Sequence, residues 1–195
     1  MLCPDYLRLF LPIVGLLVLP AIAQTAEQVD HGQVTRDGKE WNYTIRRLPP
    51  ASFPALPPAI RQELERRQCL IPQTYQAKAP ENVIAGEFRE KGVKSWAVLC
   101  SSGGMSTLLV FGSDSLGQPE ELKTSKDAEV TVPQVMSTGL GFAWGIDTVH
   151  PKRIRSFALN KDHYDHDGVE DAILTHGSSI HYYQLGKWTL LEGED

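Results

Sequence analysis

The sequence has few cysteines, no cluster of basic residues and only one long, strongly apolar segment. Three cysteines occur among 195 residues. Lysine and arginine number 19 against 24 aspartate and glutamate residues, a net charge of −5, and they are scattered along the chain. The missing basic cluster argues against a nucleic-acid-binding protein and against attachment to an anionic membrane surface. The remaining composition, 42% hydrophobic and 22% charged, is that of a globular protein.

The common catalytic motifs are also missing. The chain contains no G-x-S-x-G, H-E-x-x-H, G-x-x-x-x-G-K-[ST] or G-x-G-x-x-G motif. The segment Gly139–Gly141 lacks the third glycine of a dinucleotide-binding loop, and residues 101–104 are typical of a hairpin tip. The sequence therefore names no reaction, and a non-enzymatic function is favoured.

The strongly apolar segment lies at the N-terminus and predicts export. Residues 9–23 are uncharged and end in the small-x-small sequence Ala21-Ile22-Ala23. This pattern is typical of a signal peptide over residues 1–23 that is cleaved after Ala23, whereas a membrane-spanning helix needs about 20 apolar residues. We expect a periplasmic or secreted protein with no membrane insertion after cleavage; a retained N-terminal anchor is the alternative.

Two cysteines remain after cleavage, because Cys3 leaves with the signal peptide. An even pair in an exported chain predicts a disulfide between Cys69 and Cys100. Chain entropy then predicts a stabilisation of about 3.7 kcal/mol. The alternatives are two separate buried thiols, or a cysteine nucleophile for which no matching histidine can be placed.

The first part of the mature chain predicts a hairpin, a connector and a helix. Residues 24–47 contain a hairpin whose turn is Asp37-Gly38, a pair that favours positive φ. Residues 48–58 hold five prolines and predict an extended connector. A short helix is expected over 58–68, with Pro58 in its first turn.

Residues 82–195 predict the main sheet, so that residues 24–195 form a single β-rich domain. Short apolar or alternating segments are separated by glycine and proline turns. The expected strands are 82–88, 95–101, 106–111, 128–135, 154–159, 171–175, 180–184 and 188–191. Pro133 predicts an edge strand, and residues 136–150 show no clear pattern. Serial hairpins predict a mainly β (α+β) fold: an antiparallel sheet or sandwich with one short N-terminal helix.

One segment, residues 163–171, predicts a metal site. Alternate carboxylates in a tight loop can converge on one hard cation, and the glycine of the D-x-D-G-x-x-D sequence permits the sharp turn. A backbone carbonyl after the glycine can complete the shell. The candidate calcium ligands are His163, Asp165, Asp167, Val169 through its carbonyl, and Asp171.

The same segment, DHDGVEDAILT, resembles the calcium loops of FG-GAP or VCBS-type repeats in integrin-α-like propellers. The family pattern, D-x-D-x-D-G-x-x-D followed by a hydrophobic strand, is matched except at His163, where the family has aspartate. The resemblance implies a calcium loop before a strand. A fainter copy aligns residues 86–98 with 162–174 and shares Gly92 with Gly168. Because a propeller needs about four blades, two units favour a sheet or sandwich instead.

Two other interpretations of the acidic segment remain open. It can be a solvated turn before a strand, with carboxylates that stabilise the bend. It can also hold a transition metal in an enzyme, with ligands from His163, Asp165, His166 and Asp167.

We therefore expect an exported, non-enzymatic binding or interaction module, stabilised by calcium if the acidic loop binds it. Its partner is expected to be a protein or carbohydrate in the envelope or outside the cell, and not a nucleic acid. Trp96, Trp144 and Trp188 are expected as core anchors, with a sugar-binding surface as the alternative. Besides the metal-dependent enzyme, a third possibility is an inhibitor of a secreted hydrolase that presents the hairpin loop 101–105.

Overall fold

The computed structural model describes residues 26–113, 118–135, 137–157 and 163–192. This part of the chain forms thirteen β-strands, two short α-helices and one 3-10 turn, η1 (Pro50–Ser52). The prediction of a mainly β fold is confirmed, although the predicted helix count of one is wrong. The predicted signal peptide and its cleavage position lie outside the described residues. Within the described residues, no helix is long and apolar enough to cross a membrane.

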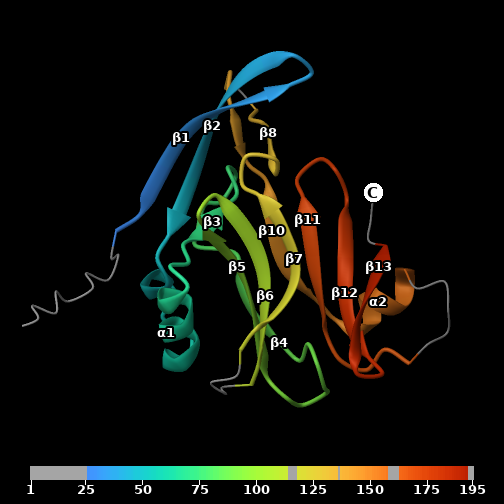
Figure 1. Ribbon diagram of the computed structural model, residues 1–195. Helices are drawn as coiled ribbons and strands as arrows, with labels where there is room; N and C mark the ends of the chain where they lie inside the picture. The colour runs from blue at the N-terminus through green and yellow to red at the C-terminus, as the bar shows by residue number, and fades with distance from the viewer. Residues whose placement is uncertain (1–25, 114–117, 136, 158–162, 193–195) are drawn as a thin grey trace, which may run out of the picture.

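The N-terminal hairpin forms the first sheet and has the predicted turn (Figure 1). Asp37 and Gly38 have φ values of 51° and 73°, the positive values that a tight hairpin turn requires. Around the hairpin, the sheet order is β1-β2-β9-β8, with β3 paired to β2. The strands are β1 (Gln28–Arg36), β2 (Lys39–Leu48), β3 (Ile71–Gln73), β8 (Thr131–Pro133) and β9 (Leu140–Phe142). Pro133 lies on an edge strand, as predicted, whereas the parallel pairing of β2 with β9 departs from the antiparallel expectation.

Two further sheets are four-stranded antiparallel meanders. The central sheet consists of β4 (Val83–Gly86), β5 (Ser95–Ser102), β6 (Met105–Gly112) and β7 (Glu120–Lys126). The outer sheet consists of β10 (Trp144–Val149), β11 (Gly168–Ile173), β12 (Ser178–Gln184) and β13 (Lys187–Glu192). Figure 1 shows the outer sheet beside the central one, on the side away from the first helix.

The central sheet is covered on both faces, which explains why β5 is almost wholly buried. One face carries Trp96 and packs on the first helix and the proline-rich segment, where Leu64 is buried. The other face carries Leu99 and packs on Trp144 and Val169 of the outer sheet. The outer sheet is therefore one layer of a stack, and only its far face is available for other contacts.

The first helix, α1 (Pro58–Arg66), ends slightly before the predicted residue 68. Gln68 has a φ of 56°, its amide donates to the carbonyl of Glu65, and the amide of Cys69 donates to the carbonyl of Leu64. These two bonds form a Schellman motif, which ends a helix by satisfying its last carbonyls. The motif turns the chain so that Cys69 faces the central sheet.

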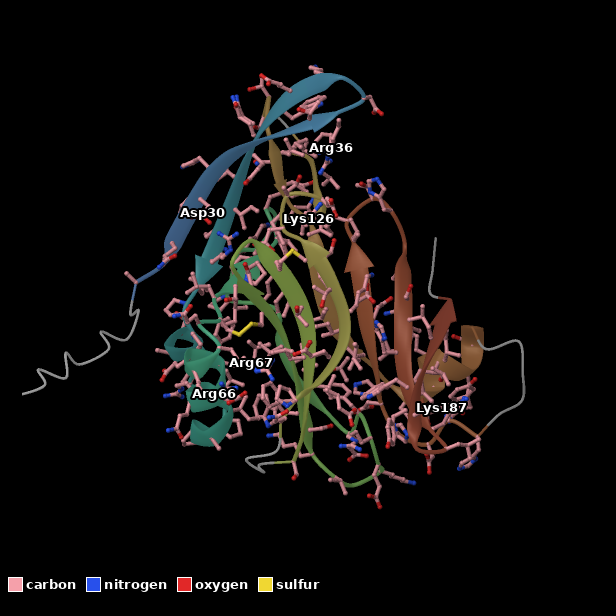
Figure 2. The ribbon with its side chains drawn as sticks, viewed as in Figure 1. Asp30, Arg36, Arg66, Arg67, Lys126 and Lys187 are labelled. Atoms are coloured by element: carbon pink, nitrogen blue, oxygen red, sulfur yellow. A yellow bond between two sulfur atoms is a disulfide. The ribbon has the colours of Figure 1, made fainter. Side chains whose placement is uncertain are left out.

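The predicted disulfide is confirmed. Cys69 is bonded to Cys100 on β5, with 5.1 Å between the Cα atoms, and the bond is the yellow link beside α1 in Figure 2. Both residues are buried. Next to the disulfide, Leu70 and Ser101 exchange two backbone hydrogen bonds of 2.9 and 2.8 Å. The disulfide and this bridge join the helix to the central sheet.

Two sequence predictions after residue 119 are wrong. The expected strand 154–159 is instead the helix α2 (Pro151–Phe157), since Pro151 suits a first helical position and Ile154 and Phe157 have helical spacing. The strand β7 lies between the expected strands 106–111 and 128–135, where no strand was expected, and its polar sequence holds one apolar residue, Leu122. It forms by pairing with β6, with a register shift opposite Leu108 and Leu109 that is typical of a β-bulge.

A buried ion pair joins the hairpin sheet to the central sheet. The NH2 group of Arg47 lies 2.5 Å from Oδ2 of Asp127, and both residues are at most 5% exposed. The hydroxyls of Ser101 and Ser106 each donate to the Asp127 carboxylate at 2.6 Å. Arg47 also pairs with Asp30. The carboxylate and the guanidinium therefore have the hydrogen bonds that a buried pair needs.

Candidate functional site

The far face of the outer sheet is covered in part by packed side chains. Near the end of β10, Ile154 of α2 and Tyr164 pack against Ile180 and Tyr182 in a third hydrophobic core. The part of this face near Gly145 and Ala172 is open. A groove of about 810 Å³ lies there, between the sheet and the segment 74–81. Its floor is formed by Gly145, Asp147, Glu170, Ala172 and Ser178.

The wall of the groove, residues 74–81, is held in shape by a clamp at its base. The side-chain amide of Gln73 donates to the carbonyl of Glu81 at 3.1 Å and accepts from the Glu81 amide at 2.9 Å. The Glu81 carboxylate in turn accepts from the amide of Thr74 at 2.7 Å. The guanidinium of Arg46 donates to the carbonyl of Ala77. The loop is therefore closed by its own hydrogen bonds.

A buried asparagine fixes this wall to the floor. Asn82 has a φ of 69°, a value that asparagine tolerates better than most residues. Its side-chain amide donates to the carbonyls of Pro72 at 2.7 Å and Trp144 at 3.2 Å, and its oxygen accepts from the Ile146 amide at 3.0 Å. These bonds satisfy the free edge of β10, so the wall and the strand keep a fixed relation.

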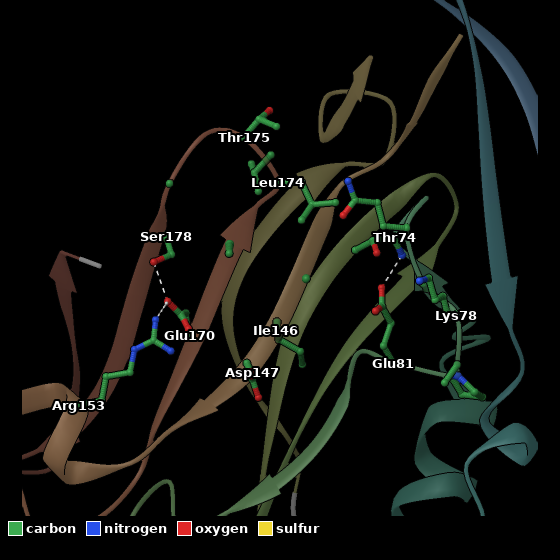
Figure 3. A pocket seen from close by; sticks show the side chains of 18 residues that line it. Thr74, Lys78, Glu81, Ile146, Asp147, Arg153, Glu170, Leu174, Thr175 and Ser178 are labelled. Atoms are coloured by element: carbon green, nitrogen blue, oxygen red, sulfur yellow. Dashed lines mark hydrogen bonds and ion pairs between the residues drawn. The ribbon is translucent and has the colours of Figure 1, made fainter. Parts of the chain in front are cut away.

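Two carboxylates on neighbouring strands belong to the floor of the groove (Figure 3). Asp147 on β10 lies directly opposite Glu170 on β11 in the strand register, and both line the groove. Glu170 is 8% exposed, and its Oε1 accepts from Ser178 Oγ at 2.8 Å and pairs with Arg153 at 3.5 Å. Asp147 is exposed, and one of its oxygens accepts from the amide of Thr148.

The first part of the acidic segment predicted to bind calcium, residues 163–167, lies before β11, at the end of this strand away from the groove. Asp167 lies at the end of the long loop before β11, and its Oδ1 is 2.7 Å from Nδ1 of His150. Its other oxygen accepts from the amide of Glu87 at 3.0 Å. The side chain therefore ties the loop between β10 and β11 to the loop between β4 and β5.

Asp171 faces the opposite side of the outer sheet and is 1% exposed. It lies between the two four-stranded sheets, where it contacts Lys123 of β7 and His181 of β12. Burial by itself raises the pKa of the Asp171 carboxyl. The hydrogen bonds from His181 and Lys123 outweigh burial and hold this pKa below its ordinary value of 3.8.

The remaining predicted ligands have separate surroundings. His166 is buried and stacks on Tyr182, and its two ring nitrogens lie 3.0 and 2.9 Å from the backbone carbonyls of Asp167 and Tyr183. His163 is exposed, with Nε2 3.8 Å from a carboxylate oxygen of Asp165. Val169 is a paired strand residue whose side chain lies in the core.

Across the described residues, no group of three or more histidine, cysteine, aspartate or glutamate side chains is placed to hold a metal ion. The structure brings Asp167 to His150 and Asp171 to His181, and it gives Asp165 a hydrogen bond from its amide to the Tyr182 hydroxyl. Calcium at this segment stays a prediction, as does the transition-metal alternative.

The suggested internal repeat can be compared with the two meanders. The aligned loops contact each other, since the amide of Asp167 donates to the carbonyl of Glu87 at 3.2 Å. The aromatic residues Phe88 and Tyr164 are both buried. However, Gly168 is paired in β11, whereas Gly92 lies in the turn before β5, so the sequence alignment is offset from the strands. The FG-GAP resemblance remains an interpretation of the sequence.

The structure also places the three tryptophans of the sugar-binding alternative and the 101–105 loop of the inhibitor alternative. Trp96 and Trp144 are core residues, and Trp188 is partly buried and hydrogen-bonded to Glu120. The 101–105 loop is a two-glycine turn in which Ser101 is buried in the Arg47 cluster. Neither position tests the sugar-binding or inhibitor interpretation.

Comparison of the chain with models of known protein families finds no match, and comparisons with curated proteins and with solved structures find none of significance. The groove residues were not singled out from the sequence. Their lining comes from segments around residues 78, 146 and 174, which are far apart in the chain. Glu81 and Asp147 belong to no recognisable motif, so only the fold identifies them as neighbours.

Proposed function

We propose that the protein is an exported binding module that holds part of another protein in the groove beside β10 and β11. The observation that carries this proposal is the groove between the far face of the outer sheet and residues 74–81, a segment whose ends are joined by hydrogen bonds. A groove of about 810 Å³ falls within the size range of about 300–1,000 Å³ that is typical of ligand sites.

The wall of the groove is preformed, which favours binding without a conformational change. The Gln73–Glu81 clamp and the Asn82 bonds hold the wall in place before any ligand arrives. A preformed site loses little conformational entropy on binding, so more of the contact energy contributes to affinity.

The lining favours a peptide segment over a carbohydrate. Among the described residues that line the groove there is no aromatic side chain on which a sugar ring can stack. Small floor residues such as Gly145 and Ala172 leave room for a main chain, and Thr74, Thr175 and Ser178 offer hydroxyls to it. The described lining holds no histidine or cysteine, so it offers no imidazole base or thiol nucleophile.

Export is part of the proposal and is supported by two observations. The disulfide between Cys69 and Cys100 is typical of oxidising compartments. The uncharged N-terminal sequence is typical of a signal peptide. A partner is therefore expected in the envelope or outside the cell.

The test is a peptide selection that distinguishes the groove from the rest of the surface. A displayed peptide library is selected on the wild type and counter-selected on Ala172→Trp, which fills the floor. Leu190→Trp, at an exposed position on β13 away from the groove, is the matched control. Peptides that bind the wild type and the control but not Ala172→Trp support the proposal. Peptides that bind Ala172→Trp as well as the wild type contradict the proposal, and so does a selection without binders. The comparison requires that all three proteins have the same melting temperature.

A further inference from the structure

We propose that the groove recognises a lysine or arginine side chain, which it holds against Asp147 and Glu170. This inference rests on the proposed function, because it names the chemistry of the segment that the groove would hold. It assigns the two carboxylates of the floor as the residues that determine specificity.

The first argument is the register of the two acidic residues. Asp147 and Glu170 are direct cross-strand partners on an antiparallel pair, and both face the groove. Side chains in such positions have Cβ atoms about 5 Å apart, and like charges there repel each other. The guanidinium of Arg153 offsets part of the Glu170 charge, and a cation placed between the two carboxylates would offset the remaining negative charge, so the floor gains from a basic ligand.

The second argument is that each of these carboxylates accepts fewer hydrogen bonds than it can. Glu170 is 8% exposed, and both of its contacts, from Ser178 and Arg153, are made through Oε1. No described residue donates to its Oε2. Asp147 has one described donor, the adjacent amide of Thr148, on Oδ1. Each carboxylate therefore keeps acceptor capacity toward the groove, and a buried acceptor gains most from a charged donor.

The third argument is the arrangement of the other charges. Glu81 adds a carboxylate from the wall, and the lining holds two cations, Lys78 on the wall and Arg153 paired with Glu170 (Figure 3), so its three carboxylates outnumber its cations. An acidic ligand group on the floor would meet two or three carboxylates. A basic side chain on the floor would meet them with opposite charge.

The experiment uses three peptides, Ala-Ser-Gly-Thr-X-Thr-Gly-Ser-Ala, in which X is lysine, glutamine or glutamate. Each is titrated into the isotope-labelled exported protein, and amide shifts are followed by NMR at low and at high salt. We expect the lysine peptide to bind at least tenfold more tightly than the glutamate peptide. The shifts should fall on β10, β11 and residues 74–81, and added salt should weaken the binding.

The variants assign the preference to the two carboxylates. Asp147→Asn and Glu170→Gln should each reduce the preference for lysine at least fivefold, and Asp147→Lys should reverse it toward the glutamate peptide. Glu40→Gln, an equal charge change at an exposed position in the first hairpin, should have no effect. Should Glu170→Gln fail to fold, the two Asp147 variants still decide the result.

Three results would overturn the inference: no shift with the lysine peptide, equal binding of all three peptides, or an unchanged preference in Asp147→Asn. Equal binding of all three peptides within the groove would be consistent with the proposed function and would overturn only the inference that the groove prefers a basic side chain. A peptide selection without any groove-dependent binder would overturn both the proposed function and this inference. Displacement of the lysine peptide by millimolar calcium alone would assign the carboxylates to a metal ion instead.

Discussion

Nε2 of His181 lies 2.6 Å from Oδ2 of Asp171, in the interface between the two four-stranded sheets. Lys123 contacts the other carboxylate oxygen, and the same ammonium group lies 5.2 Å from the ring centre of Trp144. The carboxylate thus has partners from both sheets. Since Asp171 and His181 are at most 7% exposed, the stability of this interface should respond to changes of charge.

Removal of the Asp171 charge should destabilise the protein at neutral pH. Breaking a buried pair typically lowers the free energy of unfolding by about 3–5 kcal/mol, because the partners lose their counter-charge. For Asp171→Asn we expect the lower end of this range, since the side chain of Lys123 is 37% exposed. Urea unfolding at pH 7 measures the change, with Asp37→Asn in the exposed hairpin turn as the control. A loss below about 0.5 kcal/mol, the size of an ordinary surface change, would contradict the expectation.

The same residue should contribute to acid unfolding. The pKa of Asp171 in the folded protein lies below its ordinary value of 3.8. Its stabilisation is therefore fully present above that ordinary value and is lost as the pH falls through the lower folded-state pKa. Below about pH 4, the free energy of unfolding of the wild type should fall more steeply than that of Asp171→Asn. Parallel curves from pH 6 to 2.5 would show that this carboxyl does not titrate differently in the two states.

The Arg47–Asp127 pair gives a second prediction for a buried charge. Asp127→Asn should lower the free energy of unfolding by about 3–5 kcal/mol, because Arg47 would remain buried without this counter-charge. The double variant Arg47→Met/Asp127→Leu should recover part of this loss, since it removes both charges. Glu129→Gln, which breaks an exposed pair with Lys126, should cost less than about 1 kcal/mol. A double variant that is less stable than Asp127→Asn alone would contradict this account.

Loss of the disulfide should destabilise the junction of α1 with the central sheet. Cys69→Ser and Cys100→Ser should each lower the free energy of unfolding by about 2–5 kcal/mol. Peptide mapping of the non-reduced exported protein should show the 69–100 link. Two free thiols in that sample would contradict the pairing, and a reduced wild type as stable as the oxidised one would contradict its stabilising role.

Calcium is tested by thermal melts in chelator and in millimolar calcium. Asp167 and Asp171 already have partners, so an ion at this segment would have to displace His150 or Lys123. We therefore expect equal melting temperatures, whereas the sequence pattern predicts a gain of about 1.4 kcal/mol at ten times the dissociation constant. A calcium-dependent rise that is lost in Asp165→Asn and increased in His163→Asp would support the sequence pattern.

Local features of this fold follow from the sequence where one residue or a short period determines the structure. Asp37-Gly38 predicts the first hairpin because few pairs tolerate positive φ at two successive positions. Pro58 and the continuous apolar run of β5 act in the same way. By contrast, β7 has one apolar residue and forms because β6 offers it an edge, so its own sequence gives no period to read.

The candidate site was beyond sequence reasoning for a related reason. Asp147 and Glu170 become neighbours only through the pairing of β10 with β11, and the intervening segment was misread as a strand instead of α2. The acidic segment 163–171 forms a recognisable pattern because its spacing is local. Its carboxylates are then separated by the strand, since Asp167 and Asp171 contact different loops and sheets.

The clamp between Gln73 and Glu81 also bears on how this protein can change over evolution. The stretch between the two clamp residues is held by backbone bonds such as that from the amide of Tyr75 to the carbonyl of Phe142. Such bonds do not depend on side-chain identity. Substitutions at residues 76–80 can therefore accumulate, and alter which partner fits, while the β framework keeps its stability. The same stretch is a natural place to graft a new recognition sequence.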